Sequence, residues 1–249
     1  MVIIDRVYQK VLALANREQR GYITPQEFNL FADHAQMEIF EEYFYDLERA
    51  TRSSPSHTEY TDKATAIDEK LSLFEEWKEH VTMSNSYGDL LLIGLNIYRL
   101  STVMIKYKQG DIFKQATRID PKDFYKLSSP LLNSYSLAGP YYIKHKSGND
   151  PDNFKIKIYP NVDLAAEYNV RLSYIEKPLP PNWTYFVSPD GAALYNPASS
   201  DHRNFSLHSS EENNLVIKIL QLAGVSTKDY QLMGVAAQAD AKAVQLKNK

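Results

Sequence analysis

The sequence predicts an α+β fold, a helical bundle built from the N- and C-terminal segments with an inserted antiparallel β module. Three observations support this prediction. Apolar residues recur at helical spacing in residues 1–89, apolar and polar residues alternate within residues 90–187, and helical spacing returns in residues 188–249 after a loop. Because the strands follow one another through short turns without intervening helices, we expect an antiparallel sheet or small barrel. These ranges are the predicted domains: an N-terminal helical part, the β module, and a loop with C-terminal helices that complete the bundle.

The composition is typical of a folded, soluble protein. The chain has 249 residues, of which 43% are hydrophobic and 24% are charged, so it can bury a core. No run approaches the roughly 18 apolar residues of a membrane span, and the first residues do not form a signal peptide. We therefore expect no membrane partner. The chain has no cysteine, which excludes disulfides, thiolate catalysis and cysteine-ligated metal.

Two helices are expected at the N-terminus, a short one over residues 2–15 and a long one that ends near residues 47–52. The long helix has a complete set of start signals. Thr24 is its N-cap, Pro25 occupies the first helical position, and Glu27 can close a capping box.

The apolar residues of the long helix lie on two faces when each residue turns by about 100°. One face holds Phe28, Phe31, Ala32, Ala35, Ile39 and Tyr43, and the other holds Met37, Phe40 and Phe44. A surface helix of a monomer needs only one apolar face. Either this helix is central in one large core, or its second face binds another subunit or protein. Met37, Phe40 and Phe44 are therefore interface candidates.

The next segments predict a loop, a helix and a turn. Residues 53–65 are rich in Ser, Thr and Pro, which is typical of a loop. Residues 66–81 return to helical spacing, and residues 83–89 read as a turn.

The β module begins with a β-branched and aromatic segment at residues 90–107, and a one-turn helix is expected near Phe124. Residues 154–159 and 168–175 alternate apolar and polar side chains and predict an antiparallel pair. The side chains expected to face water in this pair are Lys155, Lys157, Asn169, Arg171 and Ser173.

The segment Lys177–Trp183 is too rich in proline to continue a sheet. It predicts an extended arm, in which Trp183 anchors either the core or a neighbouring subunit. Our hypothesis is that the arm crosses a subunit boundary, because prolines pre-set an extended path and aromatic anchors dominate interfaces.

Two helices are expected after the loop at residues 188–208. The first has Ser209 as N-cap with Glu212 completing a second capping box, and Gly224 at its C-terminal end. The second spans residues 229–246.

The net charge of −3 is unevenly distributed along the chain. Residues 1–89 carry −8, residues 90–187 carry +5, and the remainder is neutral. Opposite charges can attract copies of the chain to one another, or they can neutralise each other within one subunit. The basic residues stand singly among acidic ones, so specific recognition of nucleic acid is not expected.

A search for chemistry finds no catalytic, cofactor or metal site. There is no glycine-rich phosphate loop and no nucleophile motif. The pairs His34–Glu38 and Glu76–His80 could each offer two metal ligands, but no third ligand is near, so surface or capping roles are expected. The acidic side chains of the β region, Asp111, Asp120 and Asp123, are interpreted as turn formers. The 18 Tyr, 10 Phe and 2 Trp could form a sugar-binding platform, but they fit cross-strand pairs and a protein interface more simply.

Three stretches together resemble a known class of protein. They are EQRGYITPQEFNLFADHAQMEIFEEYF near the N-terminus, IKIYP…YNVRLSYIEKPLPPNW in the β region, and SSEENNLVIKILQLAGVSTKDYQL near the C-terminus. The chain resembles head–tail connector, or adaptor, ring proteins of tailed bacteriophages, of the kind found in short-tailed marine and crAss-like phages. The resemblance covers most of the chain and is weakest in residues 50–88 and 188–208.

The resemblance implies a non-enzymatic virion structural protein that is made in the host cytoplasm. Such adaptors have a helical bundle carrying an inserted β module. They form a homo-oligomeric ring, typically of twelve copies, between the portal protein and a downstream tail protein. They extend the channel through which DNA passes during ejection, without sequence-specific binding. We expect the acidic helices to contribute more to the channel wall than the basic β module does, because a basic wall would retain phosphates. The alternatives are another tail ring or tail-hub protein, or a carbohydrate-binding or carbohydrate-cleaving module.

Overall fold

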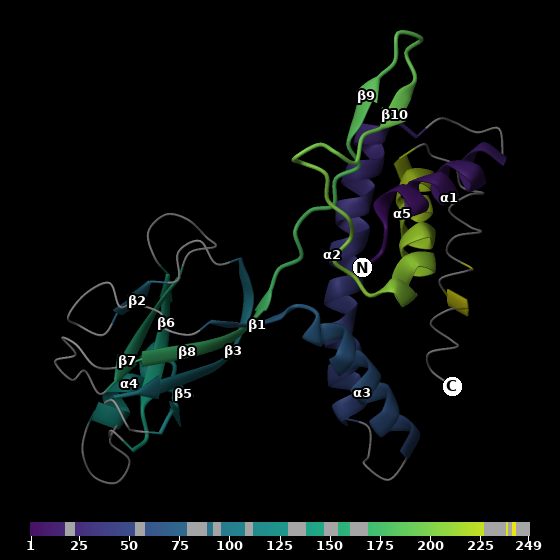
Figure 1. Ribbon diagram of the computed structural model, residues 1–249. Helices are drawn as coiled ribbons and strands as arrows, with labels where there is room; N and C mark the ends of the chain where they lie inside the picture. Colours follow the sequence, from purple (N-terminus) through teal and green to yellow (C-terminus); the bar gives the residue numbers. More distant parts are fainter. Residues whose placement is uncertain are drawn as a thin grey trace. The chain divides into compact units, whose positions relative to one another are not determined.

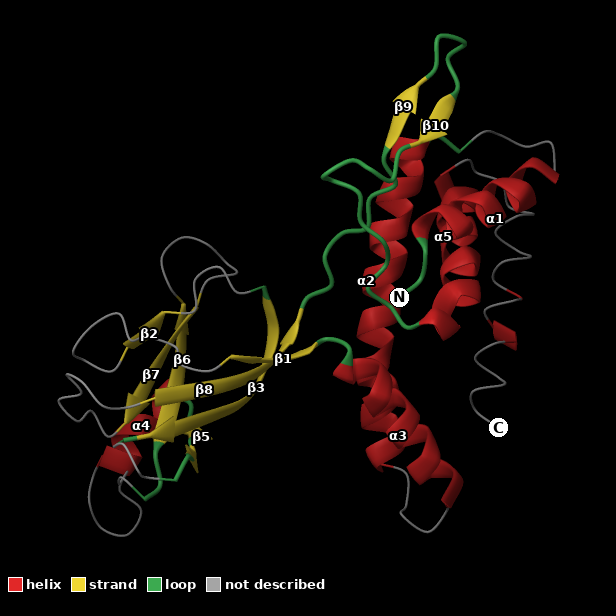
Figure 2. Cartoon of the chain, viewed as in Figure 1, coloured by secondary structure: helices red, strands yellow, loops and turns green. Residues whose placement is uncertain are grey.

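The computed structural model describes residues 1–17, 23–52, 58–78, 89–91, 96–107, 112–128, 138–146, 154–159, 169–226, 238 and 241–242. Figure 2 shows that both helices and strands form these parts, so the predicted α+β class is confirmed. The chain divides into two compact units. Unit 1 comprises residues 1–73 and 178–249, and unit 2 comprises Phe74–Lys177 (Figure 1).

Unit 1 is a helical bundle with a small hairpin. Its helices are α1 (Ile4–Arg17), α2 (Pro25–Arg52), α3 (Thr58–Ser72) and α5 (Glu212–Ser226). Helix α2 packs against α3 and α5, and α1 packs against α5. The hairpin consists of β9 (Tyr185–Val187) and β10 (Ala193–Tyr195), and it extends beyond one end of the helices (Figure 1).

The predicted start of α2 is confirmed in detail. The Thr24 side-chain oxygen accepts a hydrogen bond from the Glu27 backbone N–H at 3.3 Å, and the Glu27 carboxylate accepts one from the Thr24 backbone N–H at 3.0 Å. These two bonds form the capping box, and Pro25 is the first helical residue. The bonds from Thr24 hold the pKa of Glu27 below its usual value.

The prolines predict the extended path of residues 178–184, which we call the strap, and α2 fixes it by two amide side chains. Gln36 is fully buried; its Nε2 donates to the Leu179 carbonyl at 2.9 Å, and its Oε1 accepts from the Ser206 N–H at 2.9 Å. Asn29 Oδ1 accepts from the Trp183 N–H at 2.8 Å. Since buried backbone groups need partners, the strap belongs on this helix of its own unit.

Two predictions between the helices were wrong. Residues 58–65 are not loop, because α3 begins at Thr58, and the helix predicted over residues 66–81 ends at Ser72. Residues Glu75–Lys78 form strand β1 instead. The spacing of Ile67, Leu71 and Phe74 is too short a pattern to show where the helix ends. After Ser72 the conformation is set by the pairing of β1 with a strand about 100 residues further along the chain.

The described residues of unit 2 form two four-stranded sheets that face each other as a sandwich. One sheet has the order β1-β8-β3-β4, with β8 at Asn169–Glu176, β3 at Ile97–Lys106 and β4 at Lys114–Gln115. The other has the order β2-β7-β6-β5, with β2 at Asp89–Leu91, β7 at Phe154–Tyr159, β6 at Tyr141–Lys146 and β5 at Thr117–Arg118. All strand pairs are antiparallel except β5 with β6. The short helix α4 (Pro121–Ser128) packs Phe124 against Tyr159 of β7, with ring centroids 4.5 Å apart.

The predicted pairing of residues 154–159 with residues 168–175 was wrong. These strands are β7 and β8, and they belong to different sheets that share one core. Alternation identifies the buried face of a strand but not the neighbour that pairs with it. The core contains Ile105 of β3, Ile156 and Ile158 of β7, and Leu172 of β8, all 0% exposed. Ser173, expected to face water, is buried and donates to the Glu75 carboxylate at 2.8 Å, whereas Lys155, Lys157, Asn169 and Arg171 are half-buried.

Strand β3 contains register shifts that the sequence spacing explains. Ile97, Leu100 and Val103 all pack on the sandwich core although they are spaced by three residues. Strict alternation would point every second one of them outward. Shifts between Ile97 and Arg99 and between Leu100 and Thr102 add residues on this strand and return these side chains to the core.

The two ends of unit 2 lie side by side. Glu75 is opposite Ile175 in the β1–β8 ladder, and the Glu176 N–H donates to the Phe74 carbonyl at 2.8 Å. Because of this ladder, unit 2 begins at Phe74 and ends at Lys177, and not at the expected residues 90 and 187. Residues 185–187 belong to unit 1, where β9 pairs with β10.

The start of α5 differs from the prediction. A short 3-10 turn (Ser209–Glu211) precedes it, and the cap is His208, whose Nδ1 accepts from the Ser210 N–H at 3.2 Å. Glu212 does not close a capping box on Ser209; its carboxylate binds Lys10 of α1 at 2.7 Å. Helix α5 continues through Gly224 to Ser226, so this glycine does not end it. The helix predicted over residues 229–246 lies outside the described residues, apart from a few positions.

Candidate functional site

The hairpin β9–β10 and the cleft beside it form the candidate site. The cleft has a volume of about 580 Å³ and lies between α1 and β10. Tyr8, Gln9 and Leu12 of α1 line one side, and the turn and strand from Asp190 to Tyr195 line the other, with Trp183 between them.

Trp183 holds the hairpin onto α1. It is only 2% exposed, and its ring stacks on Tyr185 and Tyr195 at centroid distances of 5.8 Å and 5.7 Å. The Tyr8 ring lies 4.2 Å away, and the indole N–H donates to Asp5 Oδ1 at 3.0 Å. The hypothesis that Trp183 anchors a neighbouring subunit was therefore wrong, because this side chain is enclosed in the core of its own unit.

The hairpin is defined by its strand register and by a tight turn that includes Gly191. Phe186 lies opposite Leu194, and Tyr185 lies opposite Tyr195. The turn is closed by bonds from the Ser188 N–H to the Ala192 carbonyl and from the Gly191 N–H to the Ser188 carbonyl, both 2.8 Å. Gly191 has φ of 81°, a conformation that glycine adopts at no steric cost. Tyr195 also contacts His202 Nε2 through its hydroxyl at 3.3 Å, which ties β10 to residues after the hairpin.

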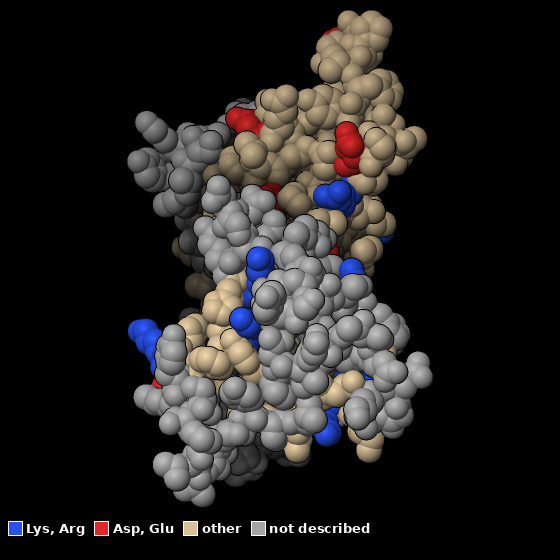
Figure 3. Space-filling view, turned by 90° about the vertical axis from the view of Figure 1, so that its left-hand side faces the viewer, with Lys and Arg blue, Asp and Glu red and all other residues tan. Residues whose placement is uncertain are grey.

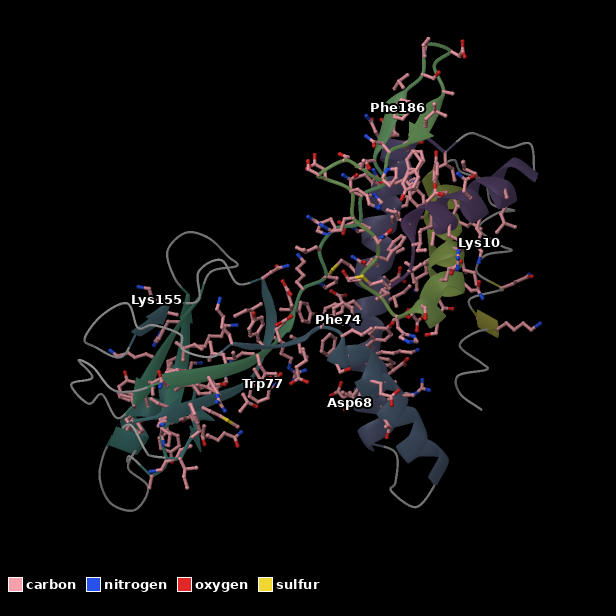
Figure 4. The ribbon with its side chains drawn as sticks, viewed as in Figure 1. Lys10, Asp68, Phe74, Trp77, Lys155 and Phe186 are labelled. Atoms are coloured by element: carbon pink, nitrogen blue, oxygen red, sulfur yellow. The ribbon has the colours of Figure 1, made fainter. Side chains whose placement is uncertain are left out.

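The two faces of the hairpin have different environments. Tyr185 and Tyr195 pack on Trp183, and burial together with the charge of Asp5 raises the pKa of Tyr195. On the other face, Phe186 is 53% exposed and Leu194 is 45% exposed. Figure 4 labels Phe186 on the hairpin. An apolar cross-strand pair is therefore left open to solvent.

The other interface candidates lie on α2. Phe40 is fully buried and packs edge to face on Phe44 at 5.2 Å. Phe40 is therefore part of the core and is not an interface residue. Met37 and Phe44 are half-buried, and their contact with a partner stays a prediction.

Two ion clusters, each with one buried charge, join the helices of unit 1. Lys218 of α5 is 3% exposed and donates to Glu38 and Glu42 of α2, both at 2.8 Å. Burial lowers the pKa of Lys218, but the two carboxylates outweigh it and the pKa is raised. Glu211 is buried and accepts from Lys70 Nζ of α3 at 2.6 Å. Glu38, considered above as a possible metal ligand with His34, thus forms an ion pair with Lys218.

The charge division of the chain is weaker when it follows the structural units. Unit 1 carries −5 and unit 2 carries +2, because Glu75, Glu76, Glu79 and Asp89 belong to unit 2. On the face drawn in Figure 3, the described Lys and Arg side chains stand singly and do not merge into a basic patch. Within the described residues, no group of three or more acidic or histidine side chains could hold a metal ion.

The sequence pattern did not predict the hairpin, because residues 188–208, which include β10, were expected to form a loop. A signal was present: the turn residues Ser188, Pro189, Asp190 and Gly191 separate two short segments of aromatic and branched residues. The strands have only three residues each, which is below the length at which alternation is readable.

No protein family model matches this chain, and no curated protein is similar to it. Among the helices that the structure describes, none has the length and apolar character needed to cross a membrane.

Proposed function

We propose that this chain is a virion structural subunit, which forms a head-to-tail adaptor ring between the portal and the tail of a tailed bacteriophage. The supporting observation is the architecture. A helical unit built from both ends of the chain contains one inserted β module, which starts and ends on adjacent strands. This is the arrangement that the resemblance to adaptor proteins implies.

In this proposal the subunit acts by assembly. The ring binds the portal protein on one side and the next tail protein on the other, and DNA passes through it without sequence-specific contacts. Unit 1 has a net charge of −5 and unit 2 one of +2. This difference supports a channel wall formed mainly by the helices of unit 1, because carboxylates do not retain phosphates. Another tail ring or tail-hub protein would use the same architecture.

The carbohydrate-binding alternative has less support. Its sugar platform would use the aromatic side chains of the β module. Of these, Tyr107, Tyr142 and Tyr174 are buried in the sandwich core, whereas Trp77 and Tyr98 are exposed. Burial accordingly raises the pKa of Tyr107 to about 12. Aromatic rings enclosed in this way cannot stack on a sugar.

Mass photometry and negative-stain microscopy of the purified chain test the proposal. The expected result is a closed ring of about twelve copies, and the ring should bind isolated portal assemblies. Glycan-array binding is the matched measurement for the alternative. A chain that stays monomeric, with and without portal protein present, would contradict the adaptor function.

A further inference from the structure

The hairpin β9–β10 is a two-stranded sheet, and neither of its edges pairs with another strand among the residues that the structure describes. Within that part of the chain its strand order is β10-β9. A two-stranded sheet is marginally stable in water, and three or more strands are normally needed. Packing on Trp183 stabilises one face of this sheet, but it provides no hydrogen bonds for the backbone groups at the two edges.

The edges lack the features that normally prevent pairing with another chain. Natural proteins protect edge strands with charged residues, proline or bulges. Each described edge strand of the sandwich has a charged residue: Glu75, Glu76 and Lys78 in β1, Lys114 in β4, Asp89 in β2 and Arg118 in β5. Strands β9 and β10 have the sequences YFV and ALY, with no charge and no proline. Phe186, Val187 and Leu194 in these strands are nevertheless exposed, with Val187 at 65%.

The hydrogen-bond pattern identifies which backbone groups point outward. The Ser188 N–H bonds to Ala192, and the Asn196 N–H bonds to Thr184. Bonded and non-bonded pairs alternate along an antiparallel ladder, so Ala193 and Val187 form a non-bonded pair. The N–H and carbonyl groups of Ala193 therefore point away from β9, and those of Val187 point away from β10.

The cleft provides space beside the edge of β10. Its lining includes Ala192, Ala193 and Leu194 on the strand side and Leu12 on the helix side. An extended segment placed there would bond to the outward groups of Ala193 and Tyr195 and would cover apolar surface.

We infer that the edge of β10 binds the edge of β9 in a second copy of this chain, so that hairpins of successive subunits join into one continuous antiparallel sheet. The inference rests on the proposed ring. A second copy is the occupant because the chain has two open edges of matching length, one on each side of the same hairpin. In the order β9-β10-β9-β10 every strand is antiparallel to the next, and the Phe186–Leu194 pairs line up on one face. A contact between two different surfaces closes into a ring when the rotation from one subunit to the next divides a full turn, and a closed sheet has no free edge.

Proline substitutions at the outward positions test this directly. Ala193→Pro removes an N–H that points into the cleft and leaves the β9–β10 bonds intact. Val187→Pro does the same on the opposite edge. Each variant alone should remain a folded monomer with the far-UV circular dichroism spectrum of the wild type, while the control Ala193→Ser, which keeps the N–H, should form wild-type rings.

Mixing the two proline variants gives the decisive result. One junction remains possible, between β9 of the Ala193→Pro chain and β10 of the Val187→Pro chain, so the mixture should form a one-to-one dimer and no ring. If the wild type forms rings and Ala193→Pro forms them equally well, the inference is overturned and the adaptor function stands. The same holds if Ala193→Pro abolishes only binding of portal or tail protein, because another protein then occupies the edge. If the wild type forms no ring, the proposed function itself fails.

Discussion

The ion cluster around Lys218 predicts that removing the lysine costs less stability than removing its two carboxylate partners. The Lys218 side chain is 4% exposed, whereas the side chains of Glu38 and Glu42 are 46% and 41% exposed. Lys218→Met keeps the aliphatic packing and leaves two carboxylates that water can solvate. Hydrogen bonds to charged groups contribute about 1.5–3 kcal/mol, so we expect a loss of about 1–3 kcal/mol in the free energy of unfolding.

Removing both carboxylates should cost more. In a Glu38→Ala/Glu42→Ala variant the buried ammonium has neither counter-charge nor acceptor, and removing the partners of a buried charge costs about 3–5 kcal/mol. Urea unfolding followed by far-UV circular dichroism measures both variants, since most described helix belongs to unit 1. The reasoning is refuted if Lys218→Met costs as much as the double variant or more.

The pH dependence follows from the direction of the shift. The pKa of Lys218 is raised above its ordinary value of 10.5, so its contribution to stability is fully present below that pH. It is lost as the pH rises through the pKa of the folded state. The difference in stability between wild type and Lys218→Met should therefore be constant near neutral pH and shrink above about pH 10.5.

Two further predictions concern α2 and the hairpin base. Thr24→Ala removes one half of the capping box and should destabilise unit 1 by about 0.5–2 kcal/mol in urea unfolding, whereas Thr24→Ser should retain most of the stability; equal losses for both would show that the cap contributes nothing. Trp183→Ala removes a fully enclosed ring and should cost about 3–5 kcal/mol, while Trp183→Phe should keep the packing and lose the bond to Asp5. A Trp183→Ala variant with unchanged stability would contradict the role of this ring as the support of the hairpin.

Local signals in the sequence predicted the fold where one segment determines its own structure. Thr24, Pro25 and Glu27 predict the start of α2 because the capping bonds join residues three apart. The fold class followed from periodicity for the same reason. Strand partners were not predictable in this way, since β7 and β8 have equally clear alternation and yet belong to different sheets. The candidate site depended on contacts between distant segments, such as Asn29 with Trp183, and no local pattern indicates which surface will cover an aromatic ring.

The adjacent ends of unit 2 have a consequence for the order of folding. Unit 2 is one continuous stretch of 104 residues, whereas unit 1 needs α2 and α5 to meet across that stretch. Closing a flexible loop of this length costs about 3 kcal/mol more than closing one of a few residues, by the logarithmic dependence on loop length. Once the sandwich has folded, Phe74 and Lys177 are already held together by the β1–β8 ladder, and this cost has been met. The sandwich should therefore gain protection from hydrogen exchange before α5 docks on α2, and variants that weaken the β1–β8 ladder should slow folding of the helical unit.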